Sequence, residues 1–200
     1  MRPVPLLALL LGAVSLVERQ RTGLAADLKP GLLLFYESEG APQPPWRIDS
    51  VSLGGALRDR SECAVVHLRR RPDQAPEQSR LCLANDTLYR WDDGVAGWTV
   101  SRPVGTRMSW TSRAANGDIV RYETEEAGQE TISGRTIPVI HTTVTTADST
   151  GRAKRRLRER YAVSLITATG GAFETADSTR TGHWLVQRRF ELREIRAAGH

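Results

Sequence analysis

The residues best suited to chemistry in this sequence are the closely spaced cations between positions 152 and 160. If this run forms a strand, alternate side chains point to one side and five cations share a face: Arg152, Lys154, Arg156, Arg158 and Arg160. Two interpretations are open. The first expectation is a solvated face paired with carboxylates of neighbouring strands, for which Glu191 and Glu194 are candidates. The alternative is an anion-binding face for an anionic lipid or polymer.

No residue pattern in the sequence predicts catalysis. The histidines have no second histidine or carboxylate at the spacing of known metal motifs: His67, His141, His183 and His200. No glycine–x–serine–x–glycine elbow and no glycine-rich phosphate loop occurs. We therefore predict a protein that is not an enzyme, with no catalytic residues, no metal site and no cofactor.

Large aromatic side chains form a second group of interest. Most of them are expected to lie in a core or to cover a sheet. If the sheet is one curved layer, some would line its concave side, where an apolar ligand could bind. The candidate lining residues are Trp46, Trp98, Trp110 and Trp184.

The chain has two cysteines, Cys63 and Cys82. If Pro72-Asp73 is a two-residue hairpin turn, residue 71 faces residue 74 and, in the same register, Cys63 faces Cys82. Cross-strand neighbours are close enough to form a disulfide. We predict this disulfide, and two unpaired buried thiols are the alternative.

The N-terminus has the features of an export signal. Arg2 precedes the apolar range Val4–Val17, which is too short to span a bilayer. With cleavage after Ala25-Ala26, residues 1–26 form a signal peptide and residues 27–200 one domain; an uncleaved N-terminal anchor is the alternative. The location is then a bacterial-like periplasm or the extracellular space, where nucleic acid is not an expected partner. The net charge of +5 is a weak indication of anionic partners.

The elements that position these residues are expected to be strands. The run Thr136–Thr146 is rich in β-branched residues, and Arg152–Thr167 follows it after the turn residues Ala147–Gly151. This order predicts a hairpin. Asn116-Gly117 is the strongest short hairpin signal in the chain. Gly170-Gly171 follows a strand but precedes no helix, so it predicts a bulge or bend.

Further strands are expected at intervals of about ten residues, which is typical of an antiparallel sheet. One helical turn is expected at Ala56–Arg60. The sequence therefore predicts an all-β, mainly antiparallel fold, a curved meander sheet or half-barrel with little helix. The remaining expected strands are Gly31–Ser38, Trp46–Leu53, Cys63–Arg70, Arg80–Ala84, Thr87–Trp91, Trp98–Ser101, Thr106–Arg113, Asp118–Glu125 and Gly182–Ile195.

The C-terminal third of the chain resembles a group of uncharacterised bacterial exported proteins. A turn at Ser133-Gly134 leads to a strand, a charged hairpin, the segment Tyr161–Leu165 and a closing strand, Leu185–Ile195. This order is similar to the DUF3108 and TapB-like families and, more remotely, to the half-barrel of LolA-like and LppX-like carriers of lipids and lipoproteins. Those carriers also have helices across the open face, which this sequence lacks. The resemblance implies an exported binding protein and no catalytic residues.

We therefore expect a noncatalytic exported or periplasmic binding protein, whose ligand is a lipid or another amphipathic envelope molecule. The alternative is an envelope protein–protein interaction module, in which exposed edge strands pair with a partner protein. Peripheral contact with a membrane fits either function, and an enzyme is the least favoured class.

Overall fold

The computed structural model describes residues 23–54, 61–114, 116–180 and 182–197. The apolar range of the predicted signal peptide and the predicted helical turn at Ala56–Arg60 lie outside the described residues. The described residues contain strands and turns but no helix, and accordingly no helix that could cross a membrane.

Thirteen strands form one sheet. Several of the predicted strands agree with the observed bounds to within one or two residues, because inward and outward side chains alternate along a strand and make it recognisable in the sequence. The strands are β1 Leu32–Ser38, β2 Ala41–Pro42, β3 Trp46–Leu53, β4 Glu62–Arg69, β5 Glu77–Ala84, β6 Thr87–Asp92, β7 Gly97–Pro103, β8 Ser109–Arg113, β9 Ile119–Ile132, β10 Arg135–Ala147, β11 Ala153–Ala162, β12 Thr167–Ala176 and β13 Trp184–Ala197.

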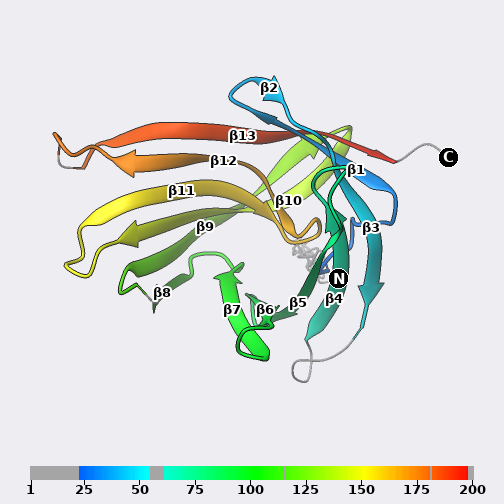
Figure 1. The fold of residues 1–200 in the computed structure, drawn as a ribbon, viewed down its shortest axis with the longest axis horizontal. Helices are drawn as coiled ribbons and strands as arrows, with labels where there is room; N and C mark the ends of the chain where they lie inside the picture. The colour runs from blue at the N-terminus through cyan, green and yellow to red at the C-terminus, as the bar shows by residue number, and fades with distance from the viewer. Residues whose placement is uncertain (1–22, 55–60, 115, 181, 198–200) are drawn as a thin grey trace, which may run out of the picture.

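The strands follow one another around the sheet in two meanders. The first runs from β3 to β7 and the second from β8 to β13. β1 joins them because it pairs with β3 on one side and with β13 on the other. Figure 1 shows the sheet curving around, with β3 and β4 on the right and β11, β12 and β13 extending to the left. This nearly closed, barrel-shaped antiparallel sheet confirms the predicted all-β fold.

The end strands of the sheet, β7 and β8, are connected by a loop that is fixed to β9. The Thr124 hydroxyl donates to the carbonyl of Gly105 (2.6 Å) and accepts a hydrogen bond from the amide of Met108 (2.8 Å). The amide of Val104 also donates to the carbonyl of Asp86 (2.8 Å). These bonds hold the end of the first meander close to the start of the second.

Turn chemistry places two hairpins where the sequence predicts them. β8 and β9 meet at Asn116-Gly117, where Gly117 has a φ of 84° that favours glycine. In the turn between β10 and β11, Asp148 Oδ1 accepts hydrogen bonds from the amides of Thr150 and Arg152, each 3.0 Å long. The side chain of an aspartate thus closes the turn, as expected.

Two strands were not predicted, the two-residue β2 and the longer β12. The expected strand Arg152–Thr167 ends early, at Ala162, and β12 begins after a turn at residues 163–166. No glycine or proline marks this turn. Ile166 adopts a φ of 53°, which β-branched residues rarely do, while its neighbour Leu165 is buried in the core. Tertiary packing therefore overrides the local preference for a strand.

The expected irregularity near Gly170-Gly171 is a bulge within β12 rather than a break between strands. The β11–β12 register shifts opposite Arg160 and Tyr161. A Cβ atom on Gly171 would lie 2.4 Å from the carbonyl oxygen of Arg158, so the two strands approach more closely than a side chain would allow.

Cys63 and Cys82 form the predicted disulfide. They lie directly opposite each other on β4 and β5. The turn also forms where the sequence places it, since the amide of Gln74 donates to the carbonyl of Arg71 (3.2 Å) around Pro72-Asp73. The bridge links the two strands inside the first meander.

The hydrophobic core lies on the inner face of the curved sheet and includes residues that precede β1. Leu24 and Ala25 are 4% and 1% exposed, and the amide of Ala25 donates to the carbonyl of Val163 (3.3 Å). A mature chain beginning at Asp27 would lack both of these core residues. The boundary of the signal peptide stays a prediction.

Candidate functional site

An interior cavity of about 720 Å³ lies between the two meanders. Its apolar floor is built by inward-pointing side chains of five strands and of the turn before β12. The almost fully buried floor residues are Leu34, Ile48, Val66, Leu81, Leu88 and Leu165. A cavity of this size and lining is suited to one small, largely apolar molecule.

Tyr36 contributes an apolar surface to the cavity although it is a polar residue. Its hydroxyl donates to the carbonyl of Ala168 (3.0 Å) and shares a hydrogen bond with the hydroxyl of Thr167 (2.9 Å). Its ring packs against Trp46 with 4.5 Å between ring centroids. Burial raises the pKa of Tyr36 well above its ordinary value, so the phenol stays neutral.

An ion pair crosses the interior from one meander to the other. Arg102 on β7 donates to Glu159 on β11, and their side chains are 21% and 5% exposed. The guanidinium also lies over the ring of Tyr161, 4.2 Å from its centroid. Burial raises the pKa of Tyr161 to about 12. Because Glu159 is almost completely removed from water, Arg102 provides the counterion that offsets the cost of burying its carboxylate.

Exposed arginines surround the opening of the cavity, and we call them the arginine rim: Arg70, Arg71, Arg90 and Arg188. The carboxylates that line the cavity, Glu37 and Glu159, already pair with Arg193 and Arg102. Within the described part of the chain, no carboxylate pairs with Arg71, Arg90 or Arg188. The lining therefore combines an apolar floor with an excess of positive charge at its edge.

The predicted anion-binding face on β11 is largely neutralised. Four of its five cations form ion pairs with carboxylates of other elements: Lys154 with Asp118, Arg156 and Arg158 with Glu174, and Arg160 with Glu130 and Glu191. Glu191 is thus an observed partner, whereas Glu194 pairs with Arg196 instead. Arg152 has no ion pair among the described residues. Anion binding at this face stays a prediction.

Glu174 is the centre of these pairs. It accepts hydrogen bonds from Arg156 Nε (2.6 Å) and Arg158 Nη2 (2.5 Å), and these side chains leave its own only 2% exposed. Burial alone would raise the pKa of Glu174, but the hydrogen bonds from both arginines outweigh burial, and the pKa lies below its ordinary value of 4.5.

The four predicted lining tryptophans do not come together. Trp46 lines the interior cavity. The other three have different partners and are absent from the cavity lining. Trp98 packs edge-on against Trp91, with 5.6 Å between centroids, Trp110 stacks on Tyr122 at 4.9 Å, and Trp184 lies beneath Arg156 at 4.2 Å.

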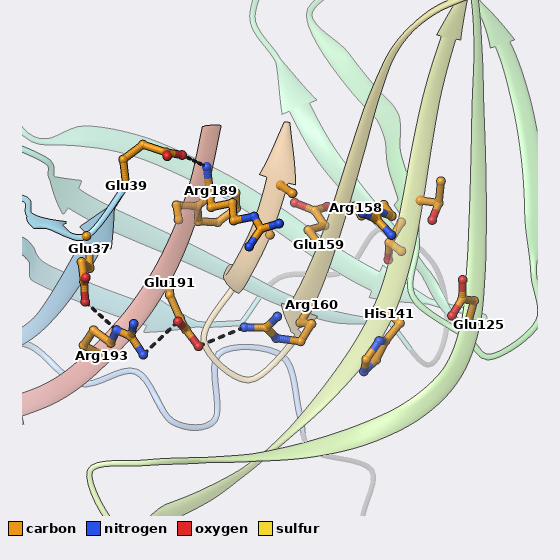
Figure 2. Close-up of a pocket in the computed structure, with 16 residues that line it drawn as sticks. Glu37, Glu39, Glu125, His141, Arg158, Glu159, Arg160, Arg189, Glu191 and Arg193 are labelled. Carbon is orange, nitrogen blue, oxygen red and sulfur yellow. Dashed lines mark hydrogen bonds and ion pairs between the residues drawn. The ribbon is translucent and has the colours of Figure 1, made fainter. Parts of the chain in front are cut away.

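A second pocket, the polar groove, has a volume of about 740 Å³ and is lined by β1, the turn after it, and β9 to β13. Figure 2 shows a chain of ion pairs along it, in which Arg193 contacts Glu37 (2.7 Å) and Glu191 (2.9 Å), and Glu191 contacts Arg160 (3.4 Å). Its charges largely neutralise one another. Among the described residues, no group of three or more His, Cys, Asp or Glu could hold a metal ion. The interior cavity is therefore the stronger candidate site.

Sequence reasoning missed the arginine rim. Arg70 and Arg71 lie in the turn after β4, and Arg90 and Arg188 lie on β6 and β13, so no spacing in the sequence connects all four. Arg102 and Glu159 escaped notice for the same reason, because they are far apart along the chain and meet only across the interior.

Comparison with known proteins identifies no family for this chain. No family model matches the chain, and no curated protein matches it either. Two solved structures are similar in fold at 9% sequence identity. A "putative lipoprotein" from Parabacteroides distasonis has a TM-score of 0.44 over 88% of this chain and 98% of its own. A "putative exported protein" with YmcC-like fold from Bacteroides fragilis has a TM-score of 0.45 over 87% and 99%. The resemblances to the DUF3108 and LolA-like families are not confirmed.

Proposed function

We propose that this protein is a noncatalytic binding protein that holds one apolar or amphipathic molecule in its interior cavity. The observation that carries the proposal is the cavity of about 720 Å³, with its buried apolar floor and its opening between arginines. An apolar or amphipathic molecule bound there would transfer part of its apolar surface from water onto the cavity walls, which favours binding.

We also propose that the protein is exported and that its ligand is a lipid or another amphipathic molecule of the bacterial envelope. Arg2 followed by the apolar range Val4–Val17 supports export. The disulfide between Cys63 and Cys82 also supports it, since disulfides persist in oxidising compartments. In the envelope, enclosing the apolar part of a ligand would allow it to pass through water.

Native mass spectrometry of the protein, exported to a bacterial periplasm and purified without detergent, tests this proposal. We expect a bound species of lipid mass. We also expect the neutral apolar dye N-phenyl-1-naphthylamine to bind at one saturable site. A bare protein that does not bind the dye would contradict the proposal and favour an interaction module that docks a protein partner.

A matched pair of variants locates the site. Ser79 lines the interior cavity, whereas Ser109 on β8 is exposed and does not. Ser79→Trp fills part of the cavity and should abolish or strongly weaken dye binding. Ser109→Trp adds the same side chain elsewhere and should leave dye binding unchanged. Equal effects of the two substitutions would place the dye outside the cavity.

A further inference from the structure

We infer that the interior cavity selects an anionic amphiphile, whose oxyanion head group is bound by the arginine rim while its apolar part lies on the floor. This inference rests on the proposed function and specifies the class of ligand. Five arginines line the cavity, Arg102 and the four of the rim, against two glutamates, Glu37 and Glu159. Both glutamates are already paired, and Arg70 pairs with Glu77 outside the lining. Within the described ranges, the positive charge left for a ligand is therefore that of Arg71, Arg90 and Arg188.

Among the described residues, three of the four rim arginines lack a carboxylate partner, which distinguishes them from the cationic face on β11; the fourth, Arg70, pairs with Glu77 (3.6 Å). On β11, four cations are matched by carboxylates of β9, β12 and β13 and of the turn before β9. Within the described ranges, Arg71, Arg90 and Arg188 have no such match. Like charges gathered around one opening repel each other, and an anion placed among them removes that repulsion. Guanidinium groups also match the geometry of carboxylate and phosphate oxygens.

The positions of two rim guanidinium groups place the charge where the apolar floor ends. Arg70 lies over the ring of Trp46, 5.0 Å from its centroid, and Arg188 lies over Phe173 at 5.3 Å. Both rings line the cavity. Arginines that pack their stems on apolar surface keep their charged ends in water. An amphiphile with its head at the rim would therefore extend its chain directly onto the floor.

Four amphiphiles with the same alkyl chain test the charge requirement: dodecanoate, dodecyl phosphate, dodecyl maltoside and dodecyltrimethylammonium. The affinity of each amphiphile is measured by its displacement of N-phenyl-1-naphthylamine from the full-length protein at low salt. Each amphiphile is used below its own critical micelle concentration. We expect the two anions to bind at least about tenfold more tightly than the neutral and cationic probes, and to weaken as salt is added. Preference for the phosphate would indicate a phospholipid-like head, and equal binding would indicate any oxyanion; either result supports the inference.

Charge-removal variants locate the head group. The rim variant should lose about tenfold in affinity for the anionic probes and keep its affinity for the neutral dye. The control variant removes three exposed arginines outside the cavity that have no carboxylate partner among the described residues, and it should behave like the wild type. The rim variant is Arg71→Gln/Arg90→Gln/Arg188→Gln, and the control is Arg113→Gln/Arg121→Gln/Arg152→Gln.

The outcomes separate this inference from the proposed function. If the dye binds but the four probes bind alike, or if the rim and control variants weaken the anions equally, the inference about charge is wrong and the binding function stands. If neither the dye nor any probe binds, both are wrong.

Discussion

Replacing Glu159 by glutamine should destabilise the protein more than any comparable change at a surface ion pair. Glu159 neutralises Arg102 across the interior, and the two side chains are 5% and 21% exposed. Glu159→Gln keeps the shape of the side chain but removes its charge, so the Arg102 guanidinium is left largely buried without a counterion. The substitution therefore weakens the contact that joins β7 to β11.

The expected magnitude follows from this burial. Removing one partner of a buried ion pair costs about 3–5 kcal/mol. The lower end, about 3 kcal/mol, applies here because Arg102 keeps some exposure and the glutamine oxygen can still accept a hydrogen bond. For a domain of this size, 1 kcal/mol corresponds to about 2–4 °C in Tm, so the expected decrease in Tm is about 6–12 °C.

Thermal and urea denaturation of ligand-free protein measure this change. The double variant Arg102→Met/Glu159→Leu, which replaces the pair by apolar side chains, should recover most of the lost stability. The matched surface control is Glu126→Gln, because the pair between Arg107 and Glu126 is 78% and 74% exposed; its effect should lie within error. If Glu159→Gln were as mild as Glu126→Gln, the ion pair would not join the meanders as described.

Three further predictions concern the two meanders. Replacing Cys63 and Cys82 by alanine should lower the free energy of unfolding by about 3 kcal/mol, and a reductant should lower the Tm of the wild type but not of the variant. Gly171→Ala should destabilise β12 by about 1–3 kcal/mol because its Cβ would clash with the β11 backbone, which urea denaturation would show. Folding lowers the pKa of Glu174, so its contribution to the free energy of unfolding is complete above pH 4.5 and is lost as the pH falls through the folded pKa. The stability of Glu174→Gln, measured by denaturation at decreasing pH, should therefore fall less below pH 4.5 than that of the wild type.

Much of the sheet follows from local rules, which is why the sequence predicts it. Asn116-Gly117 and the aspartate turn at Asp148 determine hairpins through backbone conformations and hydrogen bonds within a few residues. Once a turn is placed, the strict alternation of a strand determines which residues face each other. This is sufficient to predict the pairing of Cys63 with Cys82.

Where local preference and packing disagree, the sequence was misleading. The continuous run of strand-forming residues through Ile166 gave no sign of a turn, yet burial of Leu165 forces one there. The first expectation for the cations on β11, pairing with carboxylates of other strands, agrees with the structure, but the sequence did not identify Glu174 as a partner because it lies on another strand. A single strand does not reveal the charges that its neighbours bring.

The sequence by itself thus determined the all-β class, several of the hairpins and the disulfide, because turns and pleating act over short distances. The candidate site was decided only by the tertiary structure. Its floor and rim come from both meanders, which approach each other because β1 pairs with both β3 and β13 and because Arg102 reaches Glu159. Residues that meet across a curved sheet share no periodicity along the chain, so their proximity depends on the closure of the whole sheet.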